Sequence, residues 1–93
     1  MIKIKKRRDF SEMLEELTAQ DKSMKPIIIE RIKWFQNNPQ DTRLDNHLLT
    51  GKMSGQWAFS ITDDIRIVYE WIGKNIVRFL AIGGHQKVYR GKI

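Results

Sequence analysis

The chain has 93 residues, of which 41% are hydrophobic and 30% charged, a composition typical of one globular domain spanning residues 1–93 rather than of a disordered segment. It contains no cysteine, which excludes a disulfide framework, a thiolate metal site and a cysteine nucleophile. Its 17 Lys and Arg residues against 11 Asp and Glu give a net charge of +6, which favours an anionic partner: nucleic acid, an acidic protein or anionic lipid.

The first half of the chain predicts one strand and two helices. Isoleucine alternates with lysine over residues 1–6, which indicates an edge or near-edge strand with a basic outer face. Asp9 begins a capping-box-like pattern, and the apolar spacing that follows predicts a helix over residues 10–19. A second apolar stripe begins after residues 21–23 and should end near Pro39. Two helices this close together predict an antiparallel hairpin on one face of a sheet.

The second half predicts three consecutive strands joined by tight turns. Apolar residues alternate with small or polar ones over residues 56–61 and again over residues 65–71. Residues 76–82 are almost continuously apolar, as expected for a strand that is covered on both faces. The pair Gly83 and Gly84 should end this strand. The order β-α-α-β-β-β follows, an α+β fold with a two-helix hairpin packed on one face of a small, mainly antiparallel sheet.

The other sheet face is expected to be open, and a polar connection over residues 40–52 should precede the first of these three strands. Alternation places the following side chains on the open face: Ala58, Ser60, Arg66, Val68 and Glu70. The connection carries His47 in its middle. No internal repeat, signal peptide or membrane-spanning stretch is evident, so we expect a cytoplasmic protein without a membrane partner.

The two histidines of the chain, His47 and His85, are its first candidates for chemistry. Each could be an ordinary surface histidine on a loop. They lack a third ligand, and Asp63 and Asp64 are adjacent in a turn and cannot both point at one ion, so we expect neither a metal site nor a cofactor. An imidazole can, however, act as an acid or a base near neutral pH.

Arg66 is the second candidate, because it lies in the middle of a strand between two apolar residues. A charge there needs a partner or a ligand. It could pair with Glu70 or with a carboxylate of the first helix, or it could present its guanidinium to a phosphate on the open face. Tyr89 is the third candidate, and it could either pin the C-terminal tail to the sheet or stack on a nucleic-acid base.

Several short motifs, in order, resemble those of the RelE/ParE superfamily, the toxins of bacterial type II toxin–antitoxin modules. They are Leu49-x-Gly51, Ser54-Gly55-x-Trp57, Ile61-Thr62, Arg66-Ile67-Val68-Tyr69, and Ile82-Gly83-Gly84-His85 with Val88-Tyr89. The motifs around Trp57 and Arg66 are most similar to the YoeB branch, and the C-terminal ending is most similar to the YafQ branch.

The resemblance implies a ribonuclease that enters the ribosomal A site and cuts mRNA without metal. In this family the ribose 2′-hydroxyl attacks the adjacent phosphate, which leaves a 2′,3′-cyclic phosphate and a free 5′-hydroxyl. By position, His47 would be the base, Arg66 would stabilise the transition state, His85 would protonate the leaving oxygen and Tyr89 would stack on a base. The residues expected to contact RNA are Lys52, Asp64, Lys87 and Arg90. The implied partners are mRNA, the ribosome and a cognate antitoxin with an acidic segment.

The chain also departs from its relatives. RelE has lysines where this chain has Trp57 and Phe59, and a second histidine of YafQ is replaced by Ser60. Two alternatives therefore stay open. One is a ParE-like protein that targets gyrase, although such proteins generally lack the set of histidine and tyrosine found here. The other is an inactive module that binds RNA or an antitoxin and cuts nothing.

Overall fold

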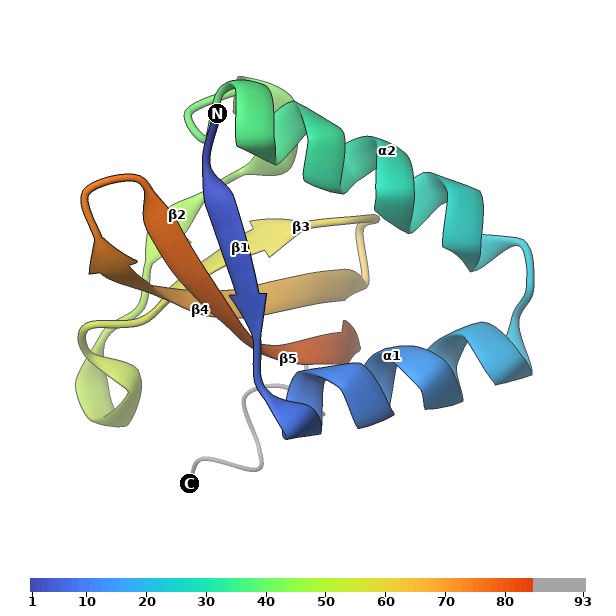
Figure 1. The fold of residues 1–93 in the computed structure, drawn as a ribbon. Helices are drawn as coiled ribbons and strands as arrows, with labels where there is room; N and C mark the ends of the chain where they lie inside the picture. The colour runs from blue at the N-terminus through green and yellow to red at the C-terminus, as the bar shows by residue number, and fades with distance from the viewer. Residues whose placement is uncertain (85–93) are drawn as a thin grey trace.

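The computed structural model describes residues 1–84 and contains two helices on one face of a five-stranded sheet (Figure 1). The elements are β1 (Lys3–Lys6), α1 (Arg8–Gln20), α2 (Met24–Asn37), the short 3-10 helix η1 (Thr42–Leu44), β2 (His47–Leu48), a second 3-10 helix η2 (Gly51–Met53), β3 (Trp57–Ser60), β4 (Ile65–Gly73) and β5 (Ile76–Gly84). The predicted α+β architecture is confirmed. Within the described part of the chain, none of the helices is long and apolar enough to cross a membrane.

The strands lie in the order β1-β5-β4-β3-β2. β1 is an edge strand, as expected from its lysines, and runs parallel to β5, whereas the other neighbours are antiparallel. β2 is a strand that the sequence did not predict. Its two residues, His47 and Leu48, pair with Ala58 and Trp57 and are both exposed, so they show no alternation of buried and exposed positions.

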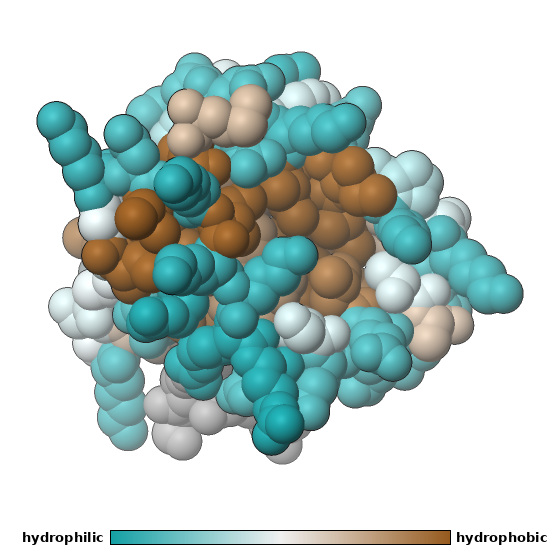
Figure 2. Space-filling view, in the orientation of Figure 1, coloured by the Kyte–Doolittle hydropathy of each residue, from teal (hydrophilic) through white to brown (hydrophobic). Residues whose placement is uncertain are grey.

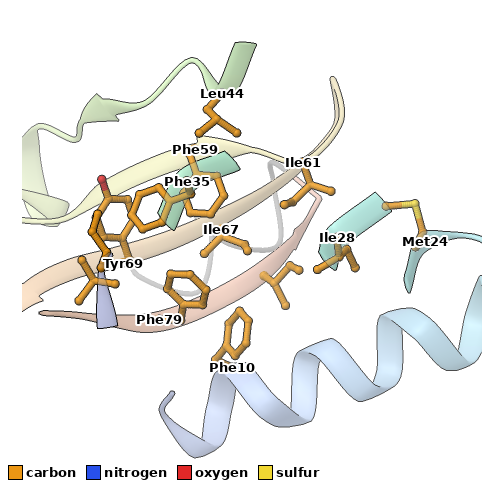
Figure 3. Packing of buried hydrophobic residues seen from close by; sticks show 13 residues of the cluster. Phe10, Met24, Ile28, Phe35, Leu44, Phe59, Ile61, Ile67, Tyr69 and Phe79 are labelled. Carbon is orange, nitrogen blue, oxygen red and sulfur yellow. The ribbon is translucent and has the colours of Figure 1, made fainter. Parts of the chain in front are cut away.

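The main core lies between the helices and the sheet, where four aromatic rings meet (Figure 3). Phe35 of α2 stacks on Phe59 of β3 with ring centroids 4.4 Å apart, and it meets the edge of Tyr69 on β4 at 4.9 Å. Phe79 of β5 joins this group, and Phe10 of α1 packs on Phe79 at 5.2 Å. All five rings are fully buried, so these aromatic contacts hold both helices on the same sheet face.

The opposite sheet face is not open at its centre, contrary to the expectation from the sequence. Ala58 and Val68 are fully buried there in a second apolar cluster, which Met53 of η2 covers. β5 supplies two adjacent residues to this cluster, Leu80 and Ala81. Val68 pairs with Ala81 and Tyr69 with Phe79, so Leu80 is the extra residue of a β-bulge that resets the alternation.

Two local predictions were wrong. Gly83 and Gly84 do not stop β5 at Ile82, because both belong to the strand and pair with Arg66 and Ile65. Asp9 does not cap α1, because the helix already begins at Arg8 and the carboxylate of Asp9 accepts a hydrogen bond from the side chain of Arg7 instead. The capping-box-like pattern therefore predicted a helix start at residue 10, two residues after the observed start at Arg8.

An apolar groove lies between the two helices. In the space-filling view its brown side chains are visible between hydrophilic rims (Figure 2). Leu14 of α1 faces Ile28, Ile29 and Ile32 of α2 across this groove, and Lys25 lies at its rim.

Candidate active site

Arg66 lies on β4, on the sheet face away from the helices, and its guanidinium is held by uncharged groups. It donates to the hydroxyl of Ser60, its cross-strand neighbour on β3, and to the backbone carbonyl of Asp63 at 3.2 Å. Glu70 is not its partner, because that carboxylate pairs with Arg78 at 2.9 Å. Within residues 1–84 no carboxylate forms an ion pair with Arg66, so its positive charge is oriented but not neutralised.

The strand on the other side of Arg66 presents a glycine to it. Gly83 of β5 pairs with Arg66, and paired residues of neighbouring strands place their side chains on the same face. A glycine at this position contributes no side chain, so that side of the guanidinium is left uncovered by β5. In the row Ser60–Arg66–Gly83, the guanidinium is therefore held by a side chain of β3 and meets no side chain from its partner on β5.

His47 lies on the same sheet face, at its edge. It pairs with Ala58 of β3, whose partner Val68 is two residues from Arg66 along β4. The ring nitrogen Nδ1 is 2.9 Å from the backbone carbonyl oxygen of Asp45. A carbonyl can only accept a hydrogen bond, so Nδ1 carries the proton and the neutral imidazole has its lone pair on Nε2. An exposed imidazole in this tautomer can accept a proton from a ligand.

One cleft brings His47 and Arg66 together. Its volume is about 490 Å³, and its lining residues are Asp45, His47, Leu48, Leu49, Thr50, Met53 and Arg66. Two strand spacings and two residue steps place the Cα atoms of His47 and Arg66 roughly 12 Å apart, within the combined reach of the two side chains. The cleft therefore combines a proton acceptor and an unneutralised cation over an apolar floor.

The segment that carries His47 is attached to the rest of the protein at several points. Leu44 is fully buried in the main core, and Arg43 lies over the ring of Trp34 at 3.6 Å. Hydrogen bonds from Arg43 lower the pKa of Asp41 to about 2, so this half-buried carboxylate is charged at neutral pH. Asp45 adopts a left-handed backbone conformation, with φ of 49°, which turns the chain immediately before β2.

The remaining candidates lie around the cleft or outside the described residues. Lys52 is exposed on η2, next to the cleft residue Met53. Asp64 is exposed in the β3–β4 turn, and its Oδ2 lies 3.3 Å from where a Cβ of Gly84 would be. The residues outside the described part of the chain are His85, Lys87, Tyr89 and Arg90. Among residues 1–84, no three His, Cys, Asp or Glu side chains lie close enough together to hold a metal ion.

Sequence reasoning did not identify the supporting residues of this site. Ser60 was placed on the same sheet face as Arg66 and noted as a departure from YafQ, but its pairing with Arg66 across the β3–β4 hairpin was not predicted. Asp45 and Asn46 were not singled out. Asp45 contacts only residues near it in the chain, whereas Asn46 bonds Tyr69, a distant residue for which the local sequence carries no signal.

Comparison with known proteins shows that the chain matches one family and is similar to several solved structures. The family model described as "Bacterial toxin of type II toxin-antitoxin system, YafQ" matches residues 2–90. A copper-bound mutant toxin from Helicobacter pylori is 21% identical, with a TM-score of 0.77 over 95% of this chain and 99% of that chain. YafQ from E. coli is 17% identical, with a TM-score of 0.74 over 96% and 99% of the two chains.

A third similar structure is the YoeB–YefM complex from Staphylococcus aureus, which is 19% identical, with a TM-score of 0.72 over 91% of this chain and 98% of that one. At these identities the similarity establishes a shared fold. No protein with a curated description matches the chain by sequence.

Proposed function

Since the chain belongs to the YafQ family of toxins from bacterial type II toxin–antitoxin systems, we propose that it is a ribosome-dependent mRNA endoribonuclease, neutralised by a cognate antitoxin. The observation that carries this proposal is the shared cleft of His47 and Arg66. RNA cleavage by an internal hydroxyl needs a proton acceptor and a cation that faces the phosphate. Both are found there, on two different strands.

The proposed reaction proceeds in line at one phosphodiester. Nε2 of His47 accepts the proton of the ribose 2′-hydroxyl, whose oxygen then bonds to the adjacent phosphorus. Arg66 stabilises the extra negative charge of the pentacoordinate phosphorane. Its guanidinium is already oriented by Ser60 and Asp63 before substrate binds. The bond from phosphorus to the 5′-oxygen breaks and that oxygen takes a proton. The products are a 2′,3′-cyclic phosphate and a 5′-hydroxyl.

The proton donor and the base-stacking residue are assigned by family likeness alone. His85 would protonate the leaving 5′-oxygen, and Tyr89 would stack on a base of the mRNA. Gly84, which immediately precedes His85, pairs with Ile65, the neighbour of Arg66.

Charge supports the assignment of the partners. A net charge of +6 attracts the mRNA and ribosomal RNA backbones, and Lys52 is an exposed cation next to the cleft residue Met53. The same charge suits an acidic antitoxin segment. The complex of YoeB with YefM shows that a toxin of this fold is bound by a partner protein, which supports the proposal of an antitoxin for this chain.

The test is inducible expression in a bacterial host with primer extension on a reporter mRNA, for the wild type and for His47→Gln. Cuts that appear only in translated message, and that are lost in the variant, would support the proposal. Cleavage of purified message on ribosomes should also proceed without added transition-metal ions, at a Mg²⁺ concentration that keeps the ribosomes intact, since no step uses a metal. Growth arrest with intact message would replace the proposal with a gyrase-directed activity, and neither arrest nor cuts would leave an inactive binding module.

A further inference from the structure

The hydroxyl of Tyr69 makes a contact that packing alone does not require. The side chain is fully buried on β4, where its ring makes an edge-type contact with Phe35, and a phenylalanine would fill the same space. The hydroxyl donates a hydrogen bond of 2.9 Å to Oδ1 of Asn46. Burial raises the pKa of Tyr69 to about 12, so at neutral pH the phenol keeps its proton and remains a donor.

The other end of the Asn46 amide is also engaged. Its Nδ2 donates to the backbone carbonyl of Pro39 at 3.0 Å. The amide therefore links three segments: the residues after α2, the residue before β2, and the centre of the sheet. A side chain held at both ends has one orientation, which fixes the backbone that carries it.

Asn46 lies between His47, which carries the imidazole, and Asp45, which binds it. Asp45 supplies the carbonyl that binds Nδ1, and His47 follows immediately. Successive side chains of an extended chain point to opposite faces. Asn46 bonds Tyr69 on the helix side of the sheet, so His47 is directed to the other face, where the cleft and Arg66 lie.

We infer that Tyr69 and Asn46 are positioning residues that hold His47 in the tautomer with a free Nε2, directed into the cleft. This inference rests on the proposed function, because a fixed tautomer matters only if His47 accepts a proton there. Neither residue touches the substrate. They act through the backbone of residues 45–47, whose carbonyl and direction they hold.

The first experiment measures the imidazole directly, by nitrogen-15 NMR of the ring in the free protein, with the signal of His47 assigned by its loss in His47→Gln. The wild type should show one tautomer, protonated on Nδ1. Tyr69→Phe, which removes the hydroxyl and keeps the ring, should shift the signals toward a mixture of tautomers. The matched control is Ile28→Val, which removes one buried methyl group from α2 and should leave the signals unchanged.

The second experiment measures cleavage of mRNA on ribosomes. Misplacing a reacting group by about 1 Å can lower a rate by about 100-fold, so Tyr69→Phe and Asn46→Ala should each lower the cleavage rate by about 10- to 100-fold. Ribosome binding should stay unchanged. Because the two residues act as one unit, the double variant should be no slower than the slower single variant.

The outcomes separate this inference from the proposed function. If Tyr69→Phe leaves both the tautomer and the cleavage rate like those of Ile28→Val, the positioning role is wrong while the ribonuclease proposal stands. If His47→Gln cuts as fast as the wild type, His47 is not the base and the positioning role fails with that assignment. If the activity losses of the two single variants add up in the double variant, Tyr69 and Asn46 do not act as a unit and the inference is overturned.

Discussion

Replacing Arg66 with alanine is the sharpest test of the proposed site, because its effects on activity and on stability should differ in size. Removing one contact that stabilises transition-state charge lowers enzyme rates by about 100- to 1000-fold, or about 2.7–4 kcal/mol. The guanidinium of Arg66 has no carboxylate partner among the described residues, so its charge is fully available to a phosphate. We therefore expect a loss of cleavage of at least about 100-fold.

The cost in stability should be small. Arg66→Ala removes two hydrogen bonds to uncharged groups, those of Ser60 and of the carbonyl of Asp63. Both lie where water can replace the guanidinium, so the loss should be about 1 kcal/mol. For a domain of this length, that corresponds to a fall of about 4–8 °C in the thermal midpoint. Calorimetry and cleavage of a defined mRNA on purified ribosomes measure the two effects separately.

Arg78 provides the matched control. It lies on the neighbouring strand β5, is also half-buried, and pairs with Glu70, so Arg78→Ala removes the same charge from the same sheet. Its cleavage rate should stay within a few-fold of the wild type. If Arg66→Ala cuts RNA as well as Arg78→Ala does, Arg66 does not face the phosphate and the reasoning is refuted. If its thermal midpoint falls as far as that of a core variant, Arg66 is a structural residue.

Three further predictions test the core, the buried phenol and the C-terminal tail. Leu44→Ala should lower the free energy of unfolding by about 2–5 kcal/mol, measured by urea denaturation, and should slow cleavage more than Ile28→Ala does, because Leu44 anchors the segment before His47. Because burial raises the pKa of Tyr69 to about 12 from 10.0, the stability due to the neutral phenol is complete below pH 10 and is lost as pH rises toward 12. Unfolding across that interval should depend less on pH in Tyr69→Phe, and equal dependence in both proteins would contradict the assignment. Deleting residues 88–93 should reduce cleavage through the loss of Tyr89, and an unchanged primer-extension pattern would exclude a role for the tail.

The sequence by itself determined the two helices and the order in which they and the strands β1, β3, β4 and β5 follow one another. Alternation of apolar residues predicted β3, β4 and β5, and helical spacing predicted α1 and α2, because these periodicities follow from local backbone geometry. The sequence also drew attention to Arg66, since a charge between buried neighbours is unusual. The assignment to a toxin family came from short motifs distributed over the second half of the chain, and the match to residues 2–90 confirms it.

Only the tertiary structure decided which side chains meet. The bulge at Leu80 turns two adjacent residues of β5 to the same face, and Met53 covers a sheet face that alternation alone left open. His47 reaches the face of Arg66 because β2 pairs with β3, and two exposed residues give no periodic signal for that pairing. Strand register and side-chain contacts such as the bond from Tyr69 to Asn46 join residues far apart in the chain. They depend on how whole surfaces fit together, and no local pattern specifies that fit.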